Sequence, residues 1–386
     1  MAPNVPTSPT VPRALSEPAA GEEMRHIRKL LGAFNFYGLN LHGEWLGKVF
    51  NAYMQPHRHF HALHHLRSIC DLAVKHQPED REMTAQLLIT ALFHDVVWFP
   101  QRNDNESQSA AAFDLLRPGF GAELPDTAAG IIRDTIIATK RQENLSETAH
   151  LFHQFDCDIL LHGSPVDLLA YEFQIFREFQ FLNLADYRKG RAAFFNRVSR
   201  RYPPCRQNMH FLVEYLERRR PRIGIYAGSF NPFHIGHLAI LQKAELMFDK
   251  VIVAVGLNPE KTHRSGDETV HAARHALPFH EVVFFDTLMV DLLDKESTFA
   301  DVTLVRGLRN GYDLDYEMSQ QCFMQEMRPQ TRSVYIPCDK SLEHISSSAL
   351  RGLRIFDCHG RDRLYFPAVF DYCYLELPQL LDWKAP

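Results

Sequence analysis

The chain lacks several features that would place it in a special class of protein. Its seven cysteines include no CxxC pair, so the sequence indicates neither a zinc ribbon nor a disulfide framework, and we expect free thiols in a reducing cytoplasm. No apolar run approaches the ~20 residues that a helix needs to cross a bilayer. A basic start followed by an apolar core is also missing. Residues 1–23, which begin with a stretch rich in Pro, Ala, Thr and Ser, are therefore predicted to be a disordered leader and not a signal peptide.

The overall composition is that of a globular protein with a weak net charge. Of the 386 residues, 45% are apolar and 23% are charged, and the formal net charge is −5. This weak negative charge argues against a general nucleic-acid-binding surface, and the length predicts two domains. The one unusual total is 21 histidines, many of which are clustered.

The two halves of the chain follow different patterns. Residues 24–219 are predicted to be consecutive helices, because apolar residues recur at spacings of three and four. From residue 222 to about 372 short β-branched runs alternate with helical stretches, which predicts a parallel sheet covered by helices. A short charged segment that contains Pro221 separates the halves, and residues 373–386 are expected to be a C-terminal tail. The predicted strands are Ile223–Tyr226, Val251–Val255, Glu281–Phe285, Thr303–Val305 and Val334–Ile336.

A turn after the first predicted strand carries the clearest chemical signal. The segment Gly228–His237 reads Gly-Ser-Phe-Asn-Pro-Phe-His-Ile-Gly-His and leads into an apolar helical pattern. A strand, a turn and a helix in this order form a phosphate-binding unit, because the free N–H groups and the positive end of the helix dipole favour anions. His234 and His237 add donors that can follow the charge that develops on a phosphate during transfer. The alternative is a structural turn with two surface histidines.

Four further features follow in the same half. Lys261 comes after the second predicted strand, and Arg306 and Arg309 follow the fourth, so all three would lie where ligands bind in open α/β sheets. Arginine suits a triphosphate because its guanidinium binds two oxygens at once and keeps its charge. Asp313–Glu317 opens the next helix, and Ile345–Ser348 precedes another, where hydroxyl and N–H groups would form a second anion site. Each feature alone could be an ordinary surface turn or helix cap.

Together these segments resemble the bacterial phosphopantetheine adenylyltransferases, of the HxGH nucleotidylyltransferase superfamily, over residues 222–372. The family's turn matches Ser229–Pro232 with Gly236-His237, its RGLR motif is intact at Arg306–Arg309, and its ISSS motif is intact at Ile345–Ser348. The resemblance implies a Rossmann-like domain that couples ATP, with Mg²⁺, to 4′-phosphopantetheine and releases dephospho-coenzyme A and pyrophosphate. By resemblance the catalytic residues are His237, Lys261, Arg309 and Ser229, and the substrate-binding residues are Gly228, Phe230, His234, Gly236, Arg306, Gly307, Asp313, Tyr316, Glu317, Ile345, Ser346, Ser347 and Ser348.

Some positions depart from that family and leave a second acceptor open. Where the family usually has an Asn-Arg pair, the chain has Met324-Gln325, and the family's LEERV stretch is replaced by Gly266–Val270. Phe233 and His234 are closer to the nicotinate or nicotinamide mononucleotide adenylyltransferases. The alternative acceptor is therefore nicotinate or nicotinamide mononucleotide, with NAD as the product.

The first half carries histidines and aspartates on three predicted helices. Five histidines lie within nine residues near its start, and among them His61 and His65 are four apart, on one face of a helix. His94-Asp95 ends a second apolar helix, and Asp156 and Asp158 lie in a third. Buried polar residues must be paired or metal-bound, and a mixed imidazole and carboxylate set suits Mn, Fe, Zn or a similar ion. The alternative is a set of hydrogen-bonded core histidines and helix-end carboxylates.

This arrangement resembles the HD superfamily of metal-dependent phosphohydrolases over residues 24–219. The resemblance implies an all-α domain in which one divalent transition metal or Mg²⁺ activates water against a phosphate ester of unknown identity. The stretch Ala138–Arg141 has no histidine where many HD proteins carry further ligands, which argues against a second metal. The alternative is an HD domain without catalysis, which senses a metabolite and gates the other half. By resemblance the metal ligands are His65, His94, Asp95 and Asp158, with His61 and Asp156 as possible ligands and Glu106 as an accessory residue near water or substrate.

The sequence thus predicts a multidomain chain in which an all-α HD-type domain precedes an α/β Rossmann-like domain with a parallel sheet. We expect a bifunctional cytoplasmic enzyme of coenzyme A biosynthesis that acts on ATP, on 4′-phosphopantetheine and on an unknown phosphorylated substrate. No nucleic-acid or membrane partner is expected, and the resemblance to the adenylyltransferases implies a homo-oligomer.

Overall fold

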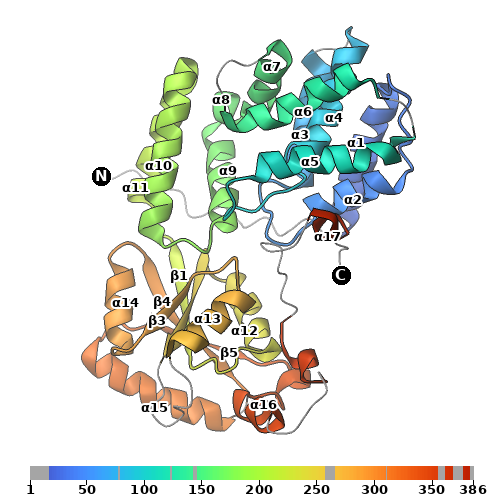
Figure 1. Ribbon diagram of the computed structural model, residues 1–386. Helices are drawn as coiled ribbons and strands as arrows, with labels where there is room; N and C mark the ends of the chain where they lie inside the picture. The colour runs from blue at the N-terminus through green and yellow to red at the C-terminus, as the bar shows by residue number, and fades with distance from the viewer. Residues whose placement is uncertain are drawn as a thin grey trace. The chain divides into compact units, whose positions relative to one another are not determined.

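The computed structural model describes residues 17–76, 79–121, 124–141, 146–256, 266–309, 311–354, 361–367 and 377–382. The chain forms two compact units (Figure 1). The helical unit comprises residues 1–178, 194–212 and 372–386, and the sheet unit comprises residues 179–193 and 213–371. Residues 1–16 of the predicted leader and the predicted catalytic residue Lys261 lie outside the described residues. Residues 17–23 belong to a helix that begins at Glu17, so the prediction of disorder is wrong for them.

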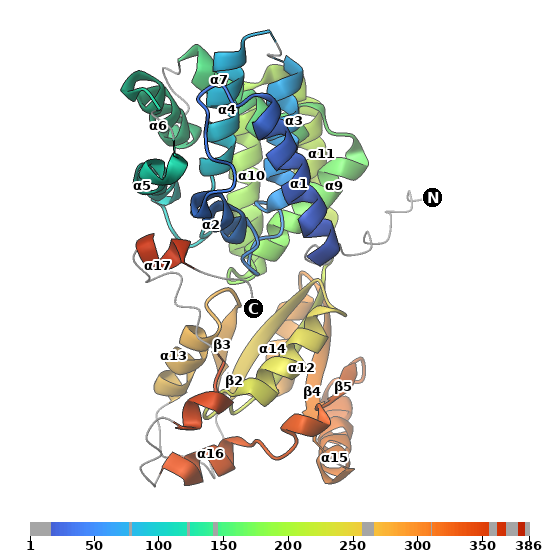
Figure 2. The same cartoon turned by 90° about the vertical axis from the view of Figure 1, so that its right-hand side faces the viewer.

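The helical unit is a set of helices packed around one apolar helix, α4 (Arg81–Phe93). Its other helices are α1 (Glu17–Ala33), α2 (Glu44–Tyr53), α3 (Leu63–His76), α5 (Asn105–Leu116), η1 (Arg117–Phe120), α6 (Asp126–Arg141), α7 (Glu147–Asp156), α8 (Asp158–His162), α9 (Pro165–Glu178), η2 (Pro203–Cys205) and α17 (Leu377–Leu381), with α10 (Leu184–Arg201) and α11 (Arg206–Arg218) divided between the units. From Thr84 to Phe93, α4 is buried at every position. A helix that is buried all round needs neighbours on every side, and α3, α5, α6 and α7 contact it (Figures 1 and 2). The prediction of a helical first half is confirmed.

The C-terminal helix α17 returns to this unit. It contacts α2 and α5, and its Leu380 and Leu381 are each 3% exposed. Lys48 Nζ on α2 lies 2.6 Å from Asp382 Oδ1, directly after α17. Part of the predicted tail 373–386 is therefore a packed helix, held by apolar burial and by one ion pair.

The described residues of the sheet unit form five parallel strands in the order β3-β2-β1-β4-β5. The strands are β1 (Arg222–Gly228), β2 (Lys250–Gly256), β3 (Val282–Phe285), β4 (Asp301–Leu308) and β5 (Ser333–Pro337), and the helices are α12 (Ile235–Glu245), α13 (Gly266–Ala276), α14 (Met289–Ser297), α15 (Gly311–Met327), η4 (Lys340–Leu342), α16 (Ser347–Arg354) and η5 (Arg361–Tyr365). Figure 2 shows α13 beside β3 at one edge of the sheet. The predicted parallel sheet is confirmed, and its topology is consistent with a Rossmann-like nucleotidyltransferase domain.

The strand order reverses at β1. Strands β2 and β3 follow on one side of β1, whereas β4 and β5 lie on the other, and β1 pairs with β4 from Arg222↔Asp301 to Tyr226↔Val305. Ligands of open α/β sheets bind outside the carboxyl ends of the strands at such a reversal. The segments that follow β1 and β4 carry the predicted phosphate-binding residues, so the fold brings both to the expected place.

Two buried charges hold neighbouring segments to the opposite, amino end of the sheet. Lys250, the first residue of β2, has no exposed surface, and its ammonium group donates to the carbonyl oxygens of Gln180 and Leu182. Asp249 is 1% exposed and pairs with Arg219 at 3.3 Å. These contacts explain why the segments before α10 and at the end of α11 group with the sheet, although the sequence pattern placed both in the first half.

Two further expectations concern membranes and thiols. Among the helices that the structure describes, none combines the length and the apolar composition that a membrane span requires. The described cysteines are free thiols, as expected, and they are Cys70, Cys157, Cys205, Cys322 and Cys338.

Candidate functional site

A cavity of about 440 Å³ lies at the carboxyl end of the sheet, beside the segments that follow β1 and β4. Every substrate-site residue predicted from the sequence lines it, except Lys261, which lies outside the described residues. Tyr226, Ala227, Ile240 and Cys338 also line it and were not predicted. Cys338 follows β5, the neighbour of β4. Because ligands of open α/β sheets bind at the carboxyl ends of the strands, its position in the sequence could have identified it. The predicted residues that the cavity brings together are Gly228, Ser229, Phe230, His234, Gly236, His237, Arg306, Gly307, Arg309, Asp313, Tyr316, Glu317, Ile345, Ser346, Ser347 and Ser348.

The turn after β1 is packed tightly around Phe230. This residue has a left-handed backbone, with φ of 40°, which an L-amino acid rarely adopts outside a constrained turn. Its ring lies 5.0 Å from the ring of Tyr226 and 5.0 Å from that of His237. A Cβ on Gly228 would lie 3.0 Å from Phe230 Cζ, so a larger residue would force the ring to shift. The packing of the turn thereby fixes the start of α12, where the two histidines lie.

Backbone hydrogen bonds set the tautomers of those histidines. The Gly236 N–H donates to His234 Nδ1 at 3.1 Å, and the His234 N–H donates to His237 Nδ1 at 3.3 Å. A nitrogen that accepts a hydrogen bond carries no proton, so each neutral ring is protonated at Nε2. The two rings stack with their centroids 3.6 Å apart. The His234 Nε2 is buried without a hydrogen-bond partner in the structure, which leaves a donor for a ligand.

The surroundings keep both rings neutral. Burial and the nearby charge of Arg309 lower the pKa of His234 to about 4. Burial, His234 and Arg309 together hold the pKa of His237 well below its usual value. At neutral pH these histidines therefore act as hydrogen-bond donors and do not exchange protons.

Acidic side chains of α15 orient the two arginines that follow β4. Arg309 binds both carboxylate oxygens of Asp313 at 3.0 Å. Arg306 Nε lies 3.0 Å from Glu317 Oε2, and its Nη1 donates to the carbonyl oxygen of Ala227. Both guanidinium groups are thus held at the cavity with N–H groups left for a ligand, because each carries five donors.

The serine segment before α16 closes the opposite side of the turn. Ser347 Oγ donates to the carbonyl oxygen of Pro232 at 3.0 Å, and Ser346 Oγ accepts from the Ala349 N–H at 3.1 Å. Arg351 donates to the carbonyl oxygen of Asn231. The serines therefore join α16 to the turn after β1. The contact of Arg351 was not expected, since nothing in a lone arginine within a helix indicates its partner.

Comparison with known proteins places this half of the chain in a family. Residues 225–353 match the model of the cytidylyltransferase-like family, and this match lies inside the sheet unit. The chain is 39% identical over 129 residues to phosphopantetheine adenylyltransferase of Kocuria rhizophila, which covers 33% of this chain and 82% of that protein. The chain belongs to the phosphopantetheine adenylyltransferase family. The enzyme of the same name from Bartonella quintana is 36% identical over 139 residues, with 34% of this chain and 79% of that protein covered.

A solved structure adds a weaker similarity. A protein of Vibrio parahaemolyticus, whose name refers to nicotinate-nucleotide adenylyltransferase, shares 20% sequence identity with a TM-score of 0.28, over 42% of this chain and 94% of that chain. A similarity of this size supports no argument about fold or acceptor. The homology to the phosphopantetheine adenylyltransferases therefore identifies a nucleotidyltransferase-like domain, and the sheet topology agrees with it.

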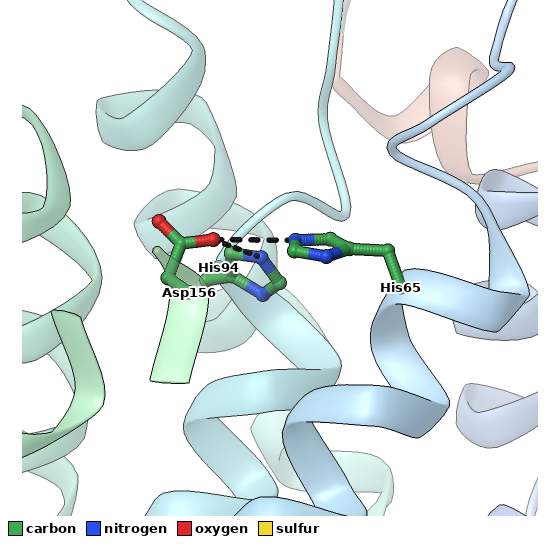
Figure 3. A group of neighbouring side chains, drawn as sticks. All are labelled: His65, His94 and Asp156. Atoms are coloured by element: carbon green, nitrogen blue, oxygen red, sulfur yellow. Dashed lines mark ion pairs between the residues drawn. The ribbon is translucent and has the colours of Figure 1, made fainter. Parts of the chain in front are cut away.

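The helical unit contains a buried group of potential metal ligands (Figure 3). Asp156 Oδ1, at the end of α7, lies 3.2 Å from His65 Nε2 on α3 and 3.8 Å from His94 Nε2 after α4. His65 is 5% exposed and His94 is 1% exposed. The Nε2 atoms of both histidines are buried without a well-directed hydrogen bond. Two imidazole nitrogens that converge on one carboxylate oxygen form a donor set that fits a divalent cation.

The other predicted metal-site residues lie in different surroundings. Asp158 accepts from His162 Nδ1 at 2.8 Å on the exposed face of α8, so the structure puts Asp156, and not Asp158, beside the two histidines. The reason is that α7 ends at Asp156 and α8 begins two residues later, which turns the second carboxylate away. Glu106 Oε2 lies 3.6 Å from Lys140 Nζ and is not part of the group.

Asp95 adds negative charge next to His94. Its Oδ2 lies 3.1 Å from His94 Nε2. Burial alone would lower the pKa of His94, but the nearby charge of Asp95 raises the pKa to about 9. Burial likewise disfavours the ionised form of Asp95, yet His94 holds the pKa of that carboxyl below its usual range. The two carboxylates thus surround the imidazole with negative charge, which favours a cation at this position.

The sequence did not indicate two residues that position this group. Glu178 of α9 is 1% exposed, and its Oε1 accepts the successive N–H groups of His59, Phe60 and His61 while its Oε2 accepts from His61 Nδ1 at 2.6 Å. Such a carboxylate fixes the backbone of the histidine-rich turn and the orientation of the His61 ring. Nothing in the sequence distinguished Glu178 from Asp167 and Glu172, the other acidic residues of α9.

The second is Arg58. It is 3% exposed and donates from Nη1 to the Asp95 carbonyl oxygen at 2.6 Å and from Nη2 to the Val96 carbonyl oxygen at 3.0 Å. A guanidinium group at the carboxyl end of a helix satisfies carbonyl groups that have no partner within the helix. Arg58 therefore holds the end of α4 and with it the His94-Asp95 pair.

Proposed function

We propose that the sheet unit transfers the adenylyl group of ATP to 4′-phosphopantetheine and releases dephospho-coenzyme A and pyrophosphate. The observation that carries the proposal is the cavity at the strand-order reversal, which gathers two neutral histidines, two oriented arginines and the serine segment. The 39% identity to a phosphopantetheine adenylyltransferase supports the choice of acceptor.

The proposed reaction is a direct displacement. An oxygen of the acceptor phosphate attacks the α-phosphorus of ATP, a new P–O bond forms, and the bond between the α-phosphorus and the bridging oxygen breaks, so that pyrophosphate leaves. The Nε2–H groups of His234 and His237 and the guanidinium of Arg309 would stabilise the charge that develops on the α-phosphate. No protein nucleophile is needed, since positioning and charge are sufficient for phosphoryl-type transfer.

The polyphosphate would be held by the remaining groups of the cavity. Arg306 and the N–H and hydroxyl groups of Ser346–Ser348 suit the β- and γ-phosphates. Mg²⁺ that accompanies ATP would offset part of their charge. The resemblance assigns Lys261 to the acceptor phosphate, and that role stays a proposal.

Replacement of His237 tests this assignment. Removal of one preorganised donor costs about 10²–10³ in kcat in comparable sites, so His237→Ala should lower kcat for pyrophosphate release by that factor. His271 is an exposed histidine on α13, and His271→Ala is the matched control that should leave kcat unchanged. Equal kcat values for the two variants would show that His237 takes no part in the reaction.

A second acceptor, nicotinate or nicotinamide mononucleotide, is favoured by two residues. His234 lines the cavity, and Met324 is 7% exposed on α15, where the phosphopantetheine family usually has a polar residue. The test is to offer ATP with each acceptor in turn and to compare kcat/KM. A preference for the mononucleotide would assign the protein to NAD synthesis, and the proposal of nucleotidyl transfer would still hold.

The helical unit has a candidate function of its own, a metal-dependent phosphohydrolase of the HD type. The observation in its favour is the convergence of His65, His94 and Asp156 in a buried site, and these residues would hold the ion. A bound divalent metal would supply water with a lowered pKa for attack on a phosphate ester. The Ala91 carbonyl oxygen, which lies 2.9 Å from His94 Nδ1, would fix the His94 ring, and Asp95, whose Oδ2 lies 3.1 Å from His94 Nε2, would add negative charge beside the ion. His61 donates from Nδ1 to Glu178, so its neutral ring would offer Nε2 as a hydrogen-bond acceptor.

Phosphate release by the full chain, with Mn²⁺, Mg²⁺ or Zn²⁺ and a panel of phosphate esters, tests this function. His94→Ala should abolish hydrolysis and leave pyrophosphate release from ATP unchanged. If His94→Ala alters adenylyl transfer while wild type hydrolyses nothing, the helical unit is instead a sensor that gates the sheet unit.

A further inference from the structure

A second group of potential ligands shares Asp156. His153, Asp156 and Cys157 each offer one ligand atom, and these atoms all lie within 4.8 Å of one another. His153 Nδ1 lies 3.2 Å from Cys157 Sγ. Two donors on one tetrahedral zinc ion lie roughly 3.5 Å apart, because Zn–N is about 2.0–2.1 Å and Zn–S is about 2.3 Å. The two atoms now form a hydrogen bond, and a small movement apart would give them the separation of two ligands of one ion.

One turn of helix positions all three side chains. His153 and Asp156 lie on the last turn of α7, and Cys157 caps the helix. Residues three and four positions apart lie on the same face of a helix, so the three side chains point to one side. His153 is 3% exposed and Cys157 is 9% exposed, and the His153 Nε2 is buried without a hydrogen-bond partner in the structure.

We propose that His153, Asp156 and Cys157 bind a second divalent cation, and that Asp156 is shared between the two metal sites. A set of imidazole, carboxylate and thiolate ligands selects zinc and its close relatives over Mg²⁺, which prefers oxygen ligands. Only the sharing of Asp156 rests on the metal-dependent function proposed above; binding to His153 and Cys157 does not.

This proposal differs from the expectation of a single metal. That expectation was based on the missing histidine at Ala138–Arg141 of α6. The second ligand set comes from α7 instead, and it includes a thiolate where a histidine was sought. Two ions that share a carboxylate form a pair suited to binding both oxygens of a phosphate group, which fits the class of substrate proposed for this unit.

Cobalt(II) is a suitable probe, because a thiolate bound to Co²⁺ gives an intense charge-transfer absorption in the near ultraviolet that nitrogen and oxygen ligands do not give. Titration of the full chain should show this absorption and a stoichiometry of two Co²⁺ per chain. Cys157→Ser should abolish the absorption and lower the stoichiometry to one. Cys70→Ser, which replaces a cysteine with no exposed surface on α3, is the matched control and should change neither. An absorption that survives in Cys157→Ser overturns the site.

A measurement on the unmodified chain protects the test against misfolding of the variant. X-ray absorption at the zinc edge, on the full chain loaded with Zn²⁺, should show a sulfur neighbour at about 2.3 Å. Nitrogen and oxygen neighbours alone would contradict the proposal.

A further variant separates this site from the one with His65 and His94. His65→Ala should lower the Co²⁺ stoichiometry to one and retain the charge-transfer absorption. If His65→Ala still binds two Co²⁺ while Cys157→Ser loses the absorption, the second site stands and the metal-dependent function proposed for His65 and His94 fails.

Discussion

At the residue scale, the protonation of His234 and His237 gives the nucleotide cavity its expected pH behaviour. With burial and Arg309 lowering the pKa of His234 to about 4 and that of His237 also lowered, neither ring should titrate near 6.5, the usual value for histidine. We expect kcat for pyrophosphate release to stay level from about pH 8 to about pH 6 and to fall as the pH approaches about 4. A pH–rate profile with a midpoint near 6.5 that disappears in His234→Ala would contradict this.

The same shift affects stability, with a defined sign. The unfolded chain takes up protons on these histidines at a higher pH than the folded chain does, so the free energy of unfolding should decrease as the pH falls from about 6.5 to about 4. In His234→Ala this pH dependence should be weaker, as urea unfolding at several pH values would show.

Glu178 is the second residue with a measurable role. It accepts three backbone N–H groups and the His61 ring, and hydrogen bonds to charged groups contribute about 1.5–3 kcal/mol each. Glu178→Gln should therefore lower the free energy of unfolding by about 3 kcal/mol or more. Glu147→Gln, at an exposed position of α7, is the control, and thermal unfolding followed by circular dichroism compares them. Equal melting temperatures would show that the Glu178 charge does not hold the turn.

The pH dependence of this contribution follows from the pKa of Glu178. Burial raises that pKa, but the charge of His61 and the hydrogen bonds lower it to about 2. The contribution of Glu178 should therefore be complete above about pH 4.3, the unfolded value, and should be lost as the pH falls toward 2.

It was easier to predict which residues carry the chemistry than to predict which way their side chains point. The histidine and arginine motifs of the second half were found because strand ends put them at one edge of the sheet. By contrast, the resemblance ranked Asp158 above Asp156, whereas the structure puts Asp156 beside His65 and His94, since the break between α7 and α8 decides which carboxylate points inward. Arg58 and Glu178 were missed because their partners are distant in sequence and are backbone groups.

At the scale of single elements, the start of α12 is the most sensitive point of the cavity. A Cβ on Gly236 would lie 3.0 Å from His234 Cε1, so Gly236→Ala should shift the imidazole by a few tenths of an ångström from its stacked position. We expect kcat to fall by about tenfold or more, because misplacement by about 1 Å is costly in such sites. Gly352→Ala in α16, where a Cβ meets nothing within 4 Å, should leave kcat unchanged. Steady-state kinetics would measure kcat for both variants, and equal values would contradict the account.

Elements with strong periodicity were predicted well, and others were not. The five strands follow the β-branched runs of the sequence, most clearly β1 and β2, which are buried along almost their whole length and therefore consist almost entirely of apolar residues. Helix α17 was predicted as tail because a short segment shows no period, and its burial depends on α2 and α5. The structure also shows that α4 is buried at every position from Thr84 to Phe93, which identifies it as the central helix of its unit.

At the scale of the whole molecule, a buried lysine determines which segments belong to the sheet unit. Lys250 pairs with Glu281 at 3.0 Å and binds the carbonyl oxygens of residues 180 and 182. Lys250→Met would leave these acceptors without a partner, and removal of one member of a buried ion pair costs about 3–5 kcal/mol. We expect a lower melting temperature than for Lys295→Met, at an exposed position of α14. If both variants melt alike, the lysine does not hold the segment.

The division into units was only partly readable from the sequence. The change from helical to β-branched patterns located the sheet. The assignment of residues 179–193 to the sheet unit and of the C-terminal helix to the helical unit depends on long-range contacts, which leave no local pattern.

Pyrophosphate release by the purified full-length chain is the most direct test of the central claim. ATP would be offered with 4′-phosphopantetheine and, in parallel, with nicotinamide mononucleotide. The account predicts release with 4′-phosphopantetheine that His237→Ala lowers by about 10²–10³ and that His271→Ala leaves unchanged. Release with the mononucleotide alone, or with neither acceptor, would contradict it.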